Sequence, residues 1–160
     1  VLAEGAAVLV VEEYERALAR GAEILAEVCG YGNTCDAYHV TAPRPDGTTQ
    51  SAAIRQALEE AEYKSCDKVY INAHGTGTPL NDTSETAAIK IALGDDAYKV
   101  HVSSTKGATG HMLGAAGAAE PAAERCPQRS GGLFLGGAAG VGGVQQQDAA
   151  CQQHQNQQPE

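Results

Sequence analysis

Two histidines and one lysine lie in loops of small residues, and side chains of these types can handle protons and stabilise oxyanions. His74 directly follows the apolar run 69–73, and Lys106 and His111 follow a second β-rich run, 100–103. In open α/β sheets, ligands bind beyond the carboxyl ends of the strands, which is where these loops would lie. We therefore treat His74, Lys106 and His111 as candidates for one site.

The chemistry that fits these residues is stabilisation of a developing negative charge on oxygen. Gly75 and Gly77 follow His74 and allow the backbone to approach a ligand closely. We expect His111 to begin a helix, whose positive end, together with Lys106, would disfavour the imidazolium form. A neutral imidazole then donates one hydrogen bond to an oxyanion. The alternative is structural: a loop histidine bonded to a turn, a surface lysine and a capping histidine.

Three acidic residues near the histidines have structural alternatives of their own. Asp82 and Glu85 are spaced as a capping box, with Asp82 as N-cap and Glu85 three residues later. Glu120 lies nine residues beyond His111. It is either a solvated helix residue or the partner of a buried lysine.

Strands and helices are predicted to alternate along the chain, which favours an α/β architecture. The expected order is strand 7–11, helix 12–20, strand 24–31, loop 32–50, helix 51–62, strand 68–72, helix 82–93, strand 100–103 and a Gly/Ala-rich helix that begins at His111. Pro121 is poorly suited to a helix interior, so we expect this helix to end there. The following segment, 121–160, is rich in Gly and Gln and is predicted to be a low-complexity tail, disordered or poorly packed.

The composition excludes several classes of function. At 160 residues the chain can bury one core or part of a larger one, and its net charge of -9 argues against nucleic-acid and membrane-surface partners. No run approaches the roughly 18 apolar residues of a membrane helix. The five cysteines form no C-x-x-C pair and are interpreted as reduced thiols. Cys151 and His154 lack further ligands, so we expect no metal.

Several motifs together resemble those of the β-ketoacyl-acyl carrier protein synthases, the condensing enzymes of type II fatty acid synthesis. The resemblance covers about residues 1–120. Its motifs are Leu2-Ala-Glu-Gly-Ala-Ala-Val-Leu-Val, Asp36-Ala-Tyr-His39, Asn72-Ala-His-Gly-Thr-Gly-Thr-Pro79, Asn81-Asp-Thr-Ser-Glu85, Ser103-Ser-Thr-Lys-Gly-Ala-Thr-Gly-His111 and Leu113-Gly-Ala-Ala-Gly117.

The resemblance implies a thiolase-like fold, present only in part, of which 1–22 would end the N-terminal half and 23–120 would form an incomplete C-terminal domain. It implies that His74 and His111 hold a malonyl thioester carbonyl and that Lys106 orients His111. The supporting polar network would comprise Asp82, Glu85 and Glu120, with Thr76 and Thr78 as candidate substrate-binding residues. Acyl carrier protein would be the partner, a homodimer the assembly, and no cofactor is expected. The expected location is the bacterial cytoplasm, or alternatively a mitochondrion or plastid.

The sequence departs from this family in two places: the nucleophilic cysteine and the C-terminal segment. The chain begins inside an apolar run without an initiator Met or a visible secretion signal, and the family's reactive cysteine would lie before Val1. We therefore expect an internal piece that cannot condense thioesters alone. The run 131–137 only weakly resembles the Gly-Phe-Gly-Gly loop that closes the site in this family. A non-catalytic partner subunit or a truncated, inactive copy remains open, whereas Ser103-Ser-Thr-Lys106 argues against a thiolase.

Overall fold

A mixed five-stranded sheet forms the centre of the molecule. The computed structural model describes residues 1–65, 67–124, 133–136 and 143–145. The strands are β1 (Glu27–Val28), β2 (Val69–Asn72), β3 (His101–Ser103), β4 (Leu133–Gly136) and β5 (Gly143–Gln145). Their order in the sheet is β1-β5-β4-β2-β3, and β2 runs parallel to both of its neighbours. The pairs β1–β5 and β4–β5 are antiparallel. The predicted α/β class is confirmed.

Strand β2 is the buried strand of this sheet. Val69 and Ile71 are buried in the core cluster with Leu58, Ile89 and Leu93. A strand that has neighbours on both sides and helices over both faces usually has a nearly continuous apolar sequence, as β2 does. The sheet therefore holds the carboxyl end of β2, and the loop that follows it, in a fixed place.

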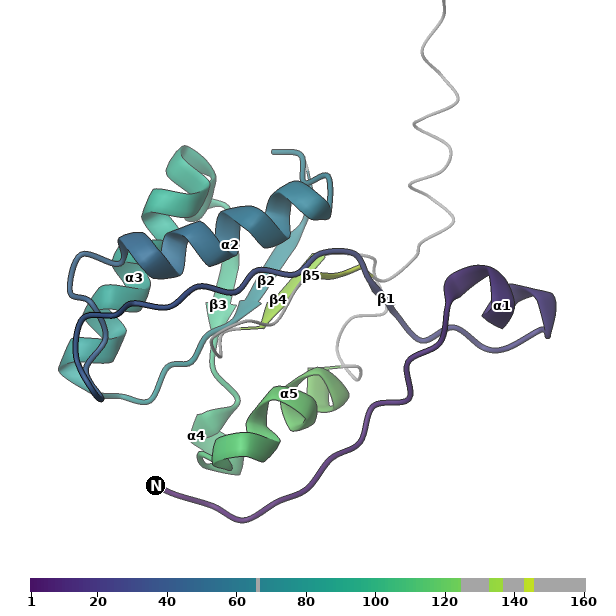
Figure 1. Ribbon diagram of the computed structural model, residues 1–160, viewed down its shortest axis with the longest axis horizontal. Coiled ribbons are helices and arrows are strands. Elements are labelled where there is room, and N and C mark those ends of the chain that lie inside the picture. Colours follow the sequence, from purple (N-terminus) through teal and green to yellow (C-terminus); the bar gives the residue numbers. More distant parts are fainter. Residues whose placement is uncertain (66, 125–132, 137–142, 146–160) are drawn as a thin grey trace, which may run out of the picture.

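Helices cover both faces of the sheet (Figure 1). On one side lie α2 (Thr48–Glu60) and α3 (Pro79–Leu93), with the 3₁₀ turn η1 (Gly94–Tyr98) after α3. On the other side lie α4 (Lys106–Thr109) and α5 (Ala116–Glu124), with the turn η2 (Leu113–Ala115) between them. This arrangement places α4 and α5 beside the ends of β2 and β3.

Close packing of α2 against α3 explains the start of α2. Gly47 has a φ of +66°, and a Cβ at this position would lie 2.7 Å from the backbone oxygen of Ser84. Only glycine tolerates both conditions, so α2 begins directly after it. The helix therefore starts three residues before the predicted Ser51, whose hydroxyl instead donates to the carbonyl of Thr48 within the helix.

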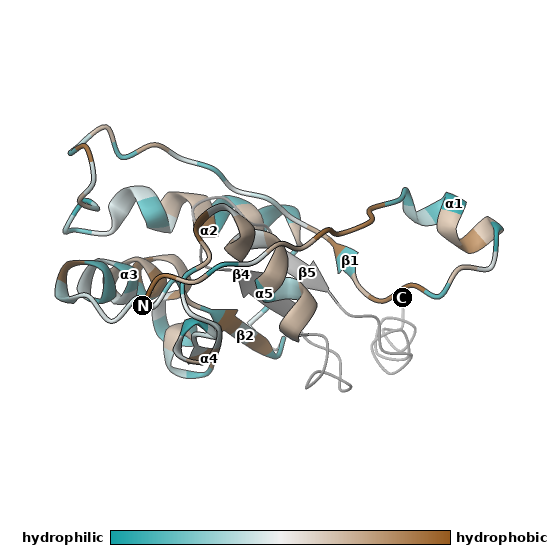
Figure 2. Ribbon diagram, turned by 90° about the horizontal axis from the view of Figure 1, so that it is seen from below, coloured by the Kyte–Doolittle hydropathy of each residue, from teal (hydrophilic) through white to brown (hydrophobic). Residues whose placement is uncertain are grey.

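The N-terminal arm, residues 1–26, differs most from expectation. It carries the short helix α1 (Tyr14–Ala19), but the predicted strand 7–11 is absent. Val8 and Val10 are 88% and 95% exposed, and Figure 2 shows this hydrophobic segment extending away from the body. A strand exists only through pairing, and in the described part of the chain no other strand lies beside this run.

Three other predictions need correction. Strand β1 covers only Glu27–Val28 instead of 24–31. No helix begins at His111, since α5 begins at Ala116 after a 3₁₀ turn. Helix α5 also continues through Pro121 to Glu124. Pro121 is the sixth residue of α5, where its ring removes one backbone hydrogen bond but does not end the helix.

The C-terminal segment contains two strands that were not predicted. β4 pairs with β2, and β5 pairs with β4 and β1, so residues 133–136 and 143–145 add two strands to the sheet. Backbone pairing decides the conformation of these residues, which a composition argument does not consider. Residues 121–124 belong to α5, and the remainder of the predicted tail lies outside the described residues.

Candidate active site

His74 and His111 meet beside the end of β2. Their ring centroids are 5.2 Å apart, and the ring planes are nearly perpendicular, at 84°. His74 comes from the loop after β2, and His111 from the segment between α4 and η2. The predicted juxtaposition of the two imidazoles is therefore present, although the two residues are far apart in sequence.

Glu85 fixes the backbone of the His74 loop. Its carboxylate accepts the N–H of His74 at 2.6 Å and the N–H of Gly75 at 2.9 Å. The predicted capping box is wrong, because α3 begins at Pro79 with Thr78 as N-cap and Glu85 reaches a different loop. A carboxylate that accepts two backbone N–H groups makes strong, charge-assisted bonds, so Glu85 holds this loop from α3.

Gly75 allows the two site loops to touch. Its φ is +46°, and a Cβ there would lie 2.6 Å from the Cβ of Ser104. The hydroxyl of Ser104 donates to the carbonyl of His74 at 3.4 Å. The sequence argument anticipated a glycine for close approach to a ligand, whereas the structure uses Gly75 for close approach between protein segments.

The surroundings of His74 favour its neutral form. Burial, followed by the positive charge of Lys106, lowers the pKa of His74 below its usual 6.5, and the carboxylate of Glu85 offsets part of this. The Nδ1 atom of His74 is buried and finds no hydrogen-bond partner among the described residues. The neutral imidazole is therefore the form of His74 that these surroundings favour.

A backbone contact selects the tautomer of a neutral His111 ring. The N–H of Leu113 donates to Nδ1 of His111 at 3.1 Å. Because Nδ1 accepts this bond, the single proton of a neutral His111 ring lies on Nε2, which is then a donor.

The N-terminal arm holds the backbone of His111. The N–H of His111 donates to the carbonyl of Val1 at 2.9 Å, and the N–H of Ala3 donates to the carbonyl of His111 at 3.0 Å. Together they form a parallel bridge between Leu2 and His111. His111 is thus positioned by strand-like pairing and not by the helix start that the sequence predicted.

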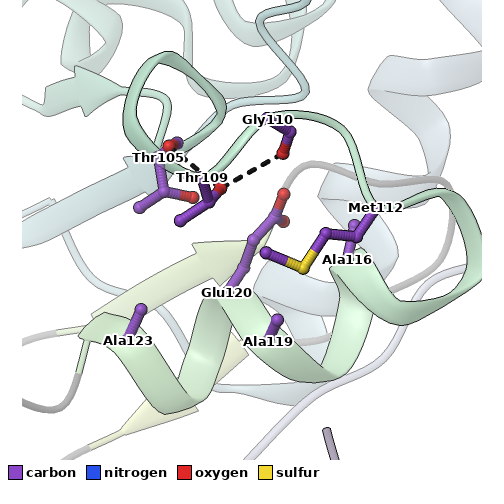
Figure 3. A pocket seen from close by; sticks show the side chains of 8 residues that line it. All are labelled: Thr105, Thr109, Gly110, Met112, Ala116, Ala119, Glu120 and Ala123. Carbon is purple, nitrogen blue, oxygen red and sulfur yellow. Dashed lines mark hydrogen bonds between the residues drawn. The ribbon is translucent and has the colours of Figure 1, made fainter. Parts of the chain in front are cut away.

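Lys106 and Glu120 form a buried ion pair. Their side chains are only 4% and 6% exposed, and Nζ of Lys106 donates to Oε1 of Glu120. The predicted pairing is confirmed. Glu120 also lines a small pocket between α4 and α5, where its carboxylate points from α5 toward the loop at Gly110 (Figure 3). The pair thereby joins the start of α4 to α5.

The remaining predicted residues lie at the margin of this cluster. The carboxylate of Asp82 accepts from Asn81 at 3.1 Å and lines a hollow beside Gly75 and Glu85. The hydroxyls of Thr76 and Thr78 are 3.0 Å apart. Thr76 is half-buried and Thr78 is exposed.

Sequence reasoning missed Asn72 and Thr105, which link the two loops. Nδ2 of Asn72 donates to Oγ1 of Thr105 at 3.1 Å, and the N–H of Thr105 donates to Oδ1 of Asn72 at 3.2 Å. The available signal was a polar residue at the end of an otherwise apolar strand, where a buried amide requires partners.

No group of three His, Cys, Asp or Glu side chains in the described ranges could hold a metal ion. Among these residues, no helix is long and apolar enough to cross a membrane.

Comparison with known proteins agrees with this geometry. The family described as "Beta-ketoacyl synthase, C-terminal domain" matches residues 25–124. The chain is 55% identical over 123 residues to 3-oxoacyl-[acyl-carrier-protein] synthase 2 of Synechocystis sp., covering 77% of this chain and 30% of that relative. The chain thus spans about 30% of the length of the curated relatives it matches.

Two solved structures have the same fold. One is a type II polyketide synthase acyl-carrier protein in complex with its ketosynthase, with a TM-score of 0.67 and 42% identity, covering 71% of this chain and 28% of that one. The other is a β-ketoacyl synthase from Burkholderia phymatum, with a TM-score of 0.61 and 40% identity, covering 71% and 27%. The fold is the thiolase-like fold, present in part. The chain belongs to the β-ketoacyl synthase family.

Proposed function

We propose that this chain supplies the malonyl-handling half of a 3-oxoacyl-acyl carrier protein synthase active site. The observation that carries the proposal is the pair of imidazoles 5.2 Å apart, beside the buried Lys106–Glu120 pair. The similarity to a 3-oxoacyl-[acyl-carrier-protein] synthase 2 supports the same substrate class.

The proposed step is decarboxylation of a malonyl thioester. The bond between the malonyl C2 and its carboxylate breaks, carbon dioxide leaves, and the electron pair moves into the thioester carbonyl to give an enolate. Two neutral imidazole donors directed at that oxygen stabilise the developing charge more than the ground state. Loss of one such donor typically costs about 3 kcal/mol in the transition state.

The enolate then attacks an acyl group held on a cysteine thiol, and the thiolate leaves. Cys29 follows β1, which is separated from β2 by β5 and β4, and Cys35 lies on an exposed loop. Neither has the activated setting that a nucleophile next to His74 requires. We assign the nucleophile to the part of the relatives' length that this chain does not span.

The same proposal covers the domain division and the partners. Residues 1–22 would end the preceding half, 23–120 would belong to the C-terminal half, and the complete protein would be a homodimer. Acyl carrier protein would be the partner, which the ketosynthase complex of similar fold supports, and it would deliver both thioesters in this proposal. The bacterial relative favours a bacterial cytoplasmic location over a mitochondrion or plastid.

The experiment joins this chain to the N-terminal part of the Synechocystis relative and supplies acyl- and malonyl-carrier protein. We expect 3-oxoacyl product from the joined protein, and none from the chain alone. His74→Ala and His111→Ala should each abolish release of carbon dioxide from malonyl-carrier protein. Normal decarboxylation in both variants would disprove the enolate role. Condensation by the 160-residue chain alone would show that the nucleophile is within it.

A further inference from the structure

Asn72 is a fully buried side chain at the point where the sheet ends and the site begins. It has 0% exposure and is the last residue of β2, two positions before His74. Beyond it, one backbone bond among the described residues continues the β2–β3 pairing, from the N–H of Ala73 to the carbonyl of Ser103. The 3.4 Å bond from Ser104 to the His74 carbonyl is a further link between the two loops, and another contact is needed to fix their relative orientation.

Asn72 provides this contact through a reciprocal pair with Thr105. The amide donates to the Thr105 hydroxyl at 3.1 Å and accepts the Thr105 N–H at 3.2 Å. Two bonds from one planar amide fix both a distance and a rotation, whereas a single bond would leave the rotation free. Thr105 is followed directly by Lys106, so the pair links the His74 segment to the start of α4.

Two other buried polar side chains, Ser51 and Ser84, do not bridge segments in this way. The hydroxyls of Ser51 and Ser84 donate to carbonyls three residues earlier, within or beside their own helices. The Asn72–Thr105 bonds instead join residues 33 positions apart. A buried amide is costly unless its groups are paired, which makes this a specific link and not an incidental one.

We infer that Asn72 and Thr105 are positioning residues, which set the separation of His74 from Lys106 and His111. Their role in holding the two loops rests on the geometry alone. Only the consequence of this role for catalysis rests on the proposed function. Neither residue touches the reacting atoms in this scheme. Both act through the geometry of the loops.

The test uses the full 160-residue chain and needs no substrate. Thr105→Val keeps the shape of the side chain but removes the hydroxyl that accepts from Asn72. Thr105→Ser keeps both bonds, and Ser51→Ala is the control, since it removes a buried hydroxyl bond in α2. Two-dimensional NMR follows the titration of the His74 ring and the contact between the His74 and His111 rings.

In Thr105→Val we expect the His74 midpoint to move toward 6.5 and the inter-ring contact to be lost, because the one remaining bond, from the N–H of residue 105, no longer fixes the rotation of the His74 loop relative to Lys106. Thr105→Ser should retain the wild-type midpoint and contact, and so should Ser51→Ala. If Thr105→Val does not fold by circular dichroism, Thr105→Ala replaces it, since it removes the hydroxyl without placing a methyl group against the amide. An unchanged midpoint and contact in the folded variant would overturn the inference.

This outcome is independent of the proposed function. A chain whose His74 responds as expected, but whose joined protein does not condense, would retain the positioning role and lose the catalytic one. If the joined protein condenses but His74 does not respond to Thr105→Val, the positioning role alone is removed.

Discussion

At the scale of single residues, the site is built to keep imidazole neutral. His74 is half-buried near Lys106, and both conditions oppose a second positive charge. Glu85 lies close enough to offset part of this effect, but it is already bound to two backbone N–H groups. The balance favours a ring that donates one proton in a hydrogen bond.

The lowered pKa of His74 predicts a dependence of stability on pH. Above pH 6.5, His74 is neutral in both states and contributes no difference. As pH falls below 6.5, the unfolded chain gains a proton that the folded chain resists, so the free energy of unfolding decreases until the folded pKa is passed. Urea unfolding at pH 7.5 and 5.5 measures this. His74→Gln should show a smaller decrease, and an equal decrease in both proteins would contradict the assignment.

The Lys106–Glu120 pair predicts a large loss of stability when only one partner is removed. Glu120→Gln leaves the Lys106 ammonium buried without its counter-charge, which typically costs about 3–5 kcal/mol. Replacing both residues, as Lys106→Met with Glu120→Leu, should recover most of this loss. Denaturant titration of the two proteins makes the comparison. A double variant as unstable as Glu120→Gln would argue against an uncompensated charge as the cause.

At the scale of elements, α3 controls the loop after β2 through one side chain. Glu85→Gln retains the size of Glu85, but its amide group presents an oxygen to one N–H and hydrogens to the other. We expect a loss of about 1–3 kcal/mol in local stability, because one buried N–H is left unpaired. Amide hydrogen exchange of His74 and Gly75 measures it.

The control for this prediction is Asp82→Asn, on the same helix. The carboxylate of Asp82 accepts a hydrogen bond from the neighbouring Asn81 side chain rather than from the His74 loop. Exchange at His74 and Gly75 should therefore stay near wild type in Asp82→Asn. If both variants accelerate exchange equally, the effect belongs to α3 as a whole and not to Glu85.

The elements that depend on local pattern were predictable from sequence. Strand β2 and helices α2 and α3 follow from apolar periodicity, to within a few residues at their ends. The site was predictable in part, because His74, Lys106 and His111 all lie in the segments that follow β2 and β3. The contacts of Glu85 with the His74 loop and of Asn72 with Thr105 were not predictable from spacing. The spacing of Asp82 and Glu85 fits a capping box, but Pro79 starts the helix earlier and frees Glu85 to bind another loop.

At the scale of the whole molecule, the N-terminal arm leaves apolar surface in water. Val8, Val10 and Val11 are 88%, 95% and 76% exposed, and α1 lies beyond them at the end of the arm (Figure 1). A contiguous apolar run with high β-propensity promotes association between chains. The same run would be covered if the chain were joined to further structure.

This exposure predicts self-association that charge can suppress. The pair of substitutions Val8→Lys and Val10→Lys should raise the concentration at which the chain stays monomeric, because lysines oppose pairing of extended segments. Light scattering against concentration measures the effect. Lysine at Ala6, an exposed residue of the same arm, is the matched control. Equal scattering from the double variant and wild type would mean that another surface associates.

The bridge between Leu2 and His111 joins residues more than one hundred positions apart. A contact of such long range forms late, since closing a long loop carries a large entropy cost. It is also made by an arm whose Val8, Val10 and Val11 side chains are exposed, so few buried contacts hold this arm. The amide proton of His111, bonded to Val1, is therefore protected only as long as the end of the arm stays in place. One of the two imidazoles at the centre of the site is thus anchored by a segment that has few buried contacts of its own, so the site can be lost while the sheet remains folded.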